Sequence, residues 1–141
     1  NESLYFFSRY LPMHFVCERV DLMIHHCGSG TYHYPILHNV PIIIIGTGCY
    51  DREEVAYRLA EIEAAKYLPS PVEDPEFLAK FKKTVDLYFH DSQFIKKKKI
   101  KLDSLKTEIN KTASDFNLKE TIEFAIRKKK TMKAYSKTGA I

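Results

Sequence analysis

The sequence lacks the features of membrane-spanning and secreted proteins. No apolar run approaches the roughly 20 residues that a transmembrane helix needs. The first residues, Asn1–Leu4, also lack the basic start of a secretory signal peptide. We therefore expect a cytoplasmic protein without a transmembrane segment.

Cysteine is scarce as well. The three thiols, Cys17, Cys27 and Cys49, are odd in number and form no C-x-x-C pair. This pattern argues against a disulfide framework and favours reduced, buried thiols. Histidine, cysteine and carboxylate residues show no spacing typical of metal ligands, so we predict no metal site.

The charges are divided unevenly along the 141 residues. The part from Lys96 onward has 14 Lys/Arg and 5 Asp/Glu, whereas the part before it has 8 and 13. We predict an α/β domain over residues 1–90 and a basic helical extension over residues 91–141. The run Lys96–Lys99 most simply forms solvated helix surface, although basic runs can also contact acidic partners. Because no aromatic residues interleave the lysines, we expect no nucleic-acid binding.

One stretch organises the chain. An apolar segment, Val20–His25, is followed by a turn containing Gly28 and Gly30, a helical segment, Tyr32–His38, and a second apolar segment, Pro41–Ile45. Strand, turn, helix and strand in this order predict a βαβ unit, whose turn lies at the carboxyl end of the first strand.

This turn has the composition of an anion site. Gly28 and Gly30 can adopt backbone angles closed to other residues and leave no Cβ in the way of a ligand. The following helix start supplies free N–H groups, and His26, Ser29 and Thr31 add side-chain donors. The simpler alternative is a tight turn before a packed helix.

The remaining pattern alternates strands and helices, which predicts a mainly parallel, Rossmann-like sheet covered by helices on both faces. The other strands are expected at Leu4–Ser8 and Ala64–Leu68, and the other helices at Met13–Arg19, Asp51–Ile62, Pro75–Phe89 and Asn117–Tyr135. Asp51 and Asp74 are the expected N-caps, and Asn39 is an expected C-cap. The side chains expected to face inward are Phe15, Val16, Val55, Leu59, Ile62, Phe77, Leu78, Phe81, Val85 and Leu87 or Tyr88.

Four segments resemble the donor-binding domain of GT-B glycosyltransferases, and most closely the UDP-glycosyltransferase group. His25–Thr31 matches the H-x-G-x-x-T/S core of that group, and Asn39–Pro41 matches its G-V-P segment. Asp51-Arg52 stands where the family has Asp-Gln, and Tyr10–Pro12 resembles its aromatic-x-Pro loop. The likeness spans roughly Leu4–Phe89.

The resemblance implies a role for each of these segments toward a UDP- or dTDP-sugar, with no metal and no other cofactor. The residues implied in diphosphate binding are His26, Gly28, Ser29, Gly30 and Thr31. Tyr10 and Tyr34 would lie beside the nucleoside, although Tyr34 stands where the family has a glutamate that binds the ribose. Asp51 and Arg52 would contact the sugar.

The resemblance also implies that this chain holds no catalytic residue. In the family, the acceptor site and the base belong to an N-terminal domain, which we expect here from a further domain or a partner subunit. Two alternatives remain open: a degenerate regulatory or scaffolding domain that binds a partner through its basic tail, and a fragment of a sugar-nucleotide epimerase. An exposed apolar stripe of Leu118, Ile122 and Ile126 on the tail would favour a homodimer.

Overall fold

The computed structural model describes residues 7, 10–117, 119–124 and 126. The chain forms two compact units, Asn1–Thr107 and Glu108–Ile141. Except for Phe7, the expected strand Leu4–Ser8 lies outside the described residues. The first unit contains every segment that carries the family resemblance.

Three parallel strands of the described chain form the sheet. They are β1 (Met23–His25), β2 (Ile42–Ile45) and β3 (Ala65–Leu68), in the order β1-β2-β3. The middle strand, β2, is buried almost throughout, with Ile42, Ile43 and Ile44 at most 1% exposed. A continuous apolar run is what a parallel strand covered on both faces requires, and the predicted parallel sheet is confirmed.

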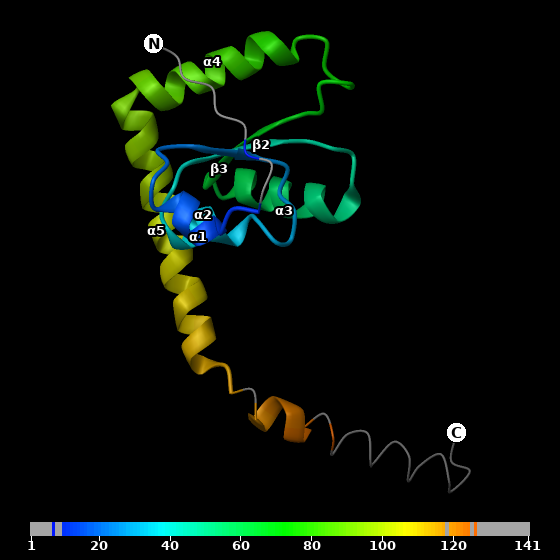
Figure 1. Ribbon diagram of the computed structural model, residues 1–141, viewed down its shortest axis with the longest axis vertical. Coiled ribbons are helices and arrows are strands. Elements are labelled where there is room, and N and C mark those ends of the chain that lie inside the picture. The colour runs from blue at the N-terminus through cyan, green and yellow to red at the C-terminus, as the bar shows by residue number, and fades with distance from the viewer. Residues whose placement is uncertain (1–6, 8–9, 118, 125, 127–141) are drawn as a thin grey trace, which may run out of the picture. The chain divides into compact units, whose positions relative to one another are not determined.

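Helices lie on both faces of the sheet (Figure 1). One layer contains α1 (Met13–Cys17), α2 (His33–Leu37) and α3 (Tyr50–Glu61), and the other contains α4 (Phe77–His90). Of the helices in the described part of the chain, none is long and apolar enough to cross a bilayer.

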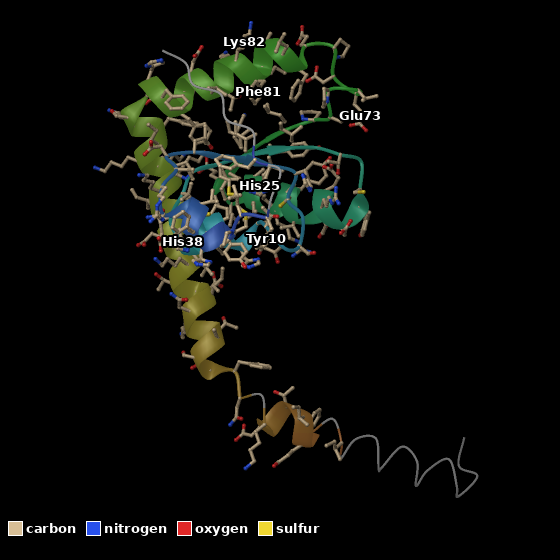
Figure 2. All side chains as sticks on the ribbon, in the orientation of Figure 1. Tyr10, His25, His38, Glu73, Phe81 and Lys82 are labelled. Atoms are coloured by element: carbon tan, nitrogen blue, oxygen red, sulfur yellow. The ribbon has the colours of Figure 1, made fainter. Side chains whose placement is uncertain are left out.

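The α4 layer is held by a small apolar core and one hydrogen bond. Ile43, Leu68 and Tyr88 form the buried centre, and Phe81 packs against it. Figure 2 shows Phe81 on the side of α4 that faces the sheet and Lys82 on the opposite side. The Tyr88 hydroxyl donates to the carbonyl oxygen of Ile42 at 2.8 Å, and burial raises the pKa of that phenol.

Two helices end in left-handed residues that send the chain back into the sheet. Asn39 has φ 56°, and Val40 N–H donates to the carbonyl of Pro35 at 2.9 Å. Glu63 has φ 60° after α3, and Ala64 N–H donates to the carbonyl of Leu59 at 2.9 Å. Both are Schellman ends. The expected C-cap role of Asn39 is confirmed. The sequence did not predict a helix end with a left-handed residue at Glu63.

Several sequence-based details are wrong. Phe15 is 50% exposed and stacks under the Arg19 guanidinium, because α1 is short and buries Cys17 instead. Leu78 is 62% exposed because it lies at the start of α4, and Ile62 is 44% exposed because it lies at the end of α3. The expected N-caps are also displaced. Cys49 precedes α3, so Asp51 belongs to its first turn, and Glu76 precedes α4, although the Asp74 carboxylate still accepts from Glu76 N–H at 3.0 Å.

The first part of α5 (Ser92–Asp115) is anchored where α3 turns into β3. Lys98 is only 7% exposed, and its ammonium donates to the carbonyls of Glu63 at 2.8 Å and Ala65 at 3.3 Å. Lys97 forms an ion pair with the Glu63 carboxylate at 2.8 Å. The first unit therefore continues to Thr107, beyond the expected domain end at residue 90.

The lysine run is thus not uniform solvated surface. Lys97 and Lys98 bind the body of the domain, and only Lys96 and Lys99 remain beside an open pocket of about 480 Å³. A partner that used the whole run would compete with the anchor of α5.

The second unit is short. Within it, α5 ends at Asp115, and residues 119–124 are again helical. The Asn117 side chain accepts from Glu120 N–H at 3.2 Å, as expected for an N-cap. Of the predicted apolar stripe, Ile122 is 49% exposed and Ile126 is 50% exposed. Leu118 and residues 125 and 127–135 of the expected helix lie outside the described residues, so the predicted homodimer stays a prediction.

Replacing Lys98 by alanine tests the anchor of α5. The substitution leaves the carbonyls of Glu63 and Ala65 without their charged donor, so we expect a loss of about 1–3 kcal/mol in the free energy of unfolding. Urea titration measures it. The control is Lys99→Ala at the exposed neighbouring position, which should change the value by less than about 0.5 kcal/mol. Equal effects of the two substitutions would contradict the anchor.

Candidate functional site

The candidate site lies at one edge of the sheet, where all three parallel strands end. His25 pairs with Ile44, and Ile45 pairs with Leu68. The loops that follow the strands therefore leave from the same edge, and Gly46 N–H donates to the carbonyl of Leu68 at 2.8 Å. Ligands of parallel α/β sheets bind at this edge.

The first turn, His26–Thr31, is closed by one carbonyl. The Gly28 oxygen accepts from Thr31 N–H at 2.8 Å and from Tyr32 N–H at 3.2 Å. Within the described part of the chain, no hydrogen bond engages the N–H groups of Ser29 and Gly30. The His26 ring lies against the turn, since a Cβ added to Gly28 would be 3.4 Å from its Nε2. The turn therefore presents two free N–H groups and an exposed imidazole.

The strained residue of this turn is Cys27. Its φ is 60°, a left-handed angle that is costly for a residue with a Cβ, and its side chain is 1% exposed. Among the described glycines, only Gly48 has a positive φ, so Gly28 and Gly30 do not use the backbone angles that glycine permits. A Cβ added to Gly30 would meet nothing within 4 Å, so the space beside this residue is open.

His25 and His26 have different environments. His25 is 9% exposed, whereas His26 is exposed. The Nδ1 atom of His25 accepts from Cys27 N–H at 2.9 Å, and its Nε2 is buried with no partner in the described chain. Burial, and then the charge of His26, lower the pKa of His25 to about 4. His25 is therefore a neutral structural residue that shapes the turn.

The second turn, Gly46–Cys49, is tied to α3 by a carboxylate. The Oε1 atom of Glu53 accepts from Thr47 N–H at 2.7 Å and from Gly48 N–H at 3.1 Å. Gly48 has φ 71°, and a Cβ on Gly46 would be 2.5 Å from the Tyr67 hydroxyl oxygen. Both glycines are thus required, one for its backbone angle and the other for close approach.

Glu53 stays ionised in this position. Burial alone would raise the pKa of its carboxyl, but the Tyr67 hydroxyl and the N–H groups of Thr47 and Gly48 outweigh burial and lower it. Burial, the Tyr57 hydroxyl and the Glu53 charge in turn raise the pKa of the Tyr67 phenol. The Tyr57 and Tyr67 rings lie 4.8 Å apart. This side of the site is a packed polar cluster around one negative charge.

The residues expected at the sugar lie on the first turn of α3. Asp51 is exposed and Arg52 is half-buried. Within the described residues, neither side chain forms a hydrogen bond or an ion pair. Both are free to contact a ligand and follow directly on the second turn.

The two tyrosines expected at the nucleoside are less closely tied to the turns. Tyr10 precedes α1 and is 84% exposed. Tyr34 lies on α2, and its ring packs on His33 with the ring centres 4.2 Å apart. No hydrogen bond between described residues joins either phenol to the first turn. Their roles stay predictions.

Sequence reasoning missed Glu53. Glu53 is the fourth residue of α3, one position past the acidic residue of a capping box, and its partners are main-chain N–H groups that precede the helix. Among the described residues, no three histidine, cysteine or carboxylate side chains lie close enough to hold a metal ion. The chemistry offered by this edge is anion and hydroxyl binding by N–H groups, an imidazole, a carboxylate and a guanidinium.

The low pKa of His25 predicts acid sensitivity of the fold. The unfolded chain binds a proton near pH 6.5 and the folded chain near pH 4, so stability falls as the pH drops between these values, by up to about 1.4 kcal/mol per pH unit. Asparagine at this position can accept from Cys27 N–H without titrating, so His25→Asn should flatten the dependence. Urea unfolding at pH 7 and pH 5 measures it. The control, His14→Asn at an exposed position of α1, should keep the wild-type slope, and an unchanged slope in His25→Asn would contradict the assignment.

Comparisons with known proteins agree with this geometry. The glycosyltransferase VinC, in a crystal structure in complex with dTDP, superposes with a TM-score of 0.52 at 22% sequence identity. The match covers 74% of this chain and 27% of VinC, so the chain spans about a quarter of the length of that protein. A search of curated protein sequences found no match.

The family comparison settles the resemblance. The family described as "Erythromycin biosynthesis protein CIII-like, C-terminal domain" matches residues 7–111, which include all three strands and both glycine turns. With the three-stranded parallel sheet of the described chain and its covering helices, this match confirms the predicted GT-B type of domain. The chain belongs to the EryCIII-like family of glycosyltransferase C-terminal domains.

Proposed function

We propose that this chain is the nucleotide-sugar-binding part of a glycosyltransferase that transfers a hexosyl group to an acceptor. The observation that carries the proposal is the first turn, with the free N–H groups of Ser29 and Gly30 and the exposed His26 at the carboxyl end of β1. The diphosphate binds there, and the sugar extends toward Asp51 and Arg52 beyond the neighbouring strand. The dTDP complex of VinC supports a nucleoside diphosphate as the ligand class.

The physical chemistry of sugar transfer fits this site. The leaving group is a nucleoside diphosphate, which gains negative charge as the glycosidic carbon departs. Donors that are fixed beside the diphosphate stabilise that charge more in the transition state than in the ground state. The turn can do this without a metal ion, because its N–H groups and the imidazole are hydrogen-bond donors.

The same proposal assigns the acceptor site and the catalytic base to a further domain or a partner subunit. The described residues at this edge provide donors for the diphosphate and polar groups for the sugar. Turnover therefore requires more than this chain, and ligand binding is the activity to measure on it.

Direct binding tests the proposal. We expect the full chain to bind dTDP or UDP, and the corresponding glucose conjugates, with dissociation constants of about 1 mM or tighter in titration calorimetry. Adenosine monophosphate serves as a control that lacks the diphosphate. A chain shown to be folded by circular dichroism that binds none of the four nucleotides would contradict the proposed function.

Replacing His26 tests the role of the turn itself. A hydrogen bond to a charged group is worth about 1.5–3 kcal/mol, so His26→Ala should weaken nucleoside-diphosphate binding roughly ten- to a hundredfold. Titration calorimetry with dTDP measures this loss.

The control for this substitution is His38→Ala, at the far end of α2. It should leave the affinity unchanged. His25 would be a poor control, since it is buried and holds the Cys27 N–H. Unchanged affinity in a folded His26→Ala chain would remove His26 from the site.

A further inference from the structure

Glu53 stands out among the charged residues of this edge because its carboxylate is already used. Its Oε1 atom accepts from two successive N–H groups, those of Thr47 and Gly48. Two converging N–H groups in a glycine turn form an anion-binding concavity. The second turn is therefore an anion site that the chain fills with its own carboxylate, whereas the N–H groups of Ser29 and Gly30 in the first turn have no partner among the described residues.

The two hydrogen bonds close a small ring of chain. The ring runs from Thr47 through the first turn of α3 to Glu53, and it contains Asp51 and Arg52. Closing the ring fixes where α3 begins relative to the end of β2. The contact between Glu53 and the second turn thus fixes the positions of Asp51 and Arg52, although neither residue takes part in it.

The ring is also held from the sheet side. The Tyr67 hydroxyl of β3 lies so close to Gly46 that a Cβ there would be 2.5 Å from it, and the same Cβ would be 3.2 Å from the Glu53 Oε1 atom. Burial, and then the charge of Glu53, raise the pKa of the Cys27 thiol in the first turn to about 11. Glu53 is therefore in contact with the second turn and β3, and within electrostatic reach of the first turn.

We propose that Glu53 is a positioning residue for the sugar end of the donor: by binding Thr47 and Gly48 it holds Asp51 and Arg52 in place beside the first turn. The inference rests on the proposed function and adds to it a residue that touches no ligand. It also predicts that the diphosphate binds at the first turn alone, because the anion site of the second turn is occupied.

The experiment compares two ligands that differ only in the sugar. Titration calorimetry on the full chain gives the affinities of dTDP and dTDP-glucose for wild type, Glu53→Ala and Glu53→Gln. The matched control is Glu54→Ala, which removes the next carboxylate of the same helix; among the described residues, this carboxylate pairs only with Arg58 at the surface. Circular dichroism confirms the fold of each variant.

We expect Glu53→Ala to weaken the binding of dTDP-glucose about tenfold and the binding of dTDP less than twofold. The reason is that a loosened loop has to be ordered again when the sugar binds. Glu53→Gln keeps an acceptor oxygen and the same shape, so it should lose less of the sugar-dependent affinity than alanine. The Glu53→Gln variant also tests the proposal if the alanine variant does not fold. A residue with a merely structural role would weaken both ligands in parallel.

Each result bears on one claim. A ratio of the two affinities that stays within twofold in both Glu53 variants, or that shifts equally in Glu54→Ala, would overturn the positioning role while leaving the proposed function standing. Absence of binding of either nucleotide to the wild type would overturn the proposed function and this inference with it. A lower ratio of the dTDP-glucose affinity to the dTDP affinity, found in the Glu53 variants alone, supports the inference.

Discussion

The burial of β2 is the constraint on which the rest of the domain depends. An apolar strand with at most 1% exposure at Ile42, Ile43 and Ile44 needs a hydrogen-bonding neighbour on each edge and a helix layer on each face. Parallel neighbours require crossover connections, and α2 and α3 provide them. The carboxyl ends of the strands then meet at one edge, where the chain has its polar turns. The site is thus a consequence of how one strand is covered.

The elements of the fold could be predicted because their signals are local. The isoleucine run, the glycine turns and the Asn39 cap each specify their own conformation, and every strand and helix expected in residues 10–90 is present within a few residues. Details that depend on packing between elements were not predictable. Phe15 shows this, since a five-residue helix has too little surface to bury both Phe15 and Cys17.

The candidate site shows the same division. The loop His26–Thr31 was proposed from residue types and spacing, and it follows β1 as expected, whereas its role toward a ligand stays a prediction. The left-handed angle at Cys27 was not foreseeable, because a residue with a Cβ adopts it only when buried neighbours hold it there. Glu53 was missed because its partners are main-chain N–H groups, whose direction depends on the turn geometry. Lys98 was taken for surface because its partners, two carbonyl oxygens, carry no residue-type signal at all.

The distribution of the thiols has a practical consequence. Cys17 and Cys27 are buried, and Cys49 is exposed where the second turn meets α3. A maleimide dye therefore reacts at a single position on the folded chain, two residues before Asp51. Fluorescence from that position reports on the surroundings of Asp51 and Arg52 without any engineered cysteine, and the two buried thiols become reactive only when the structure around them opens.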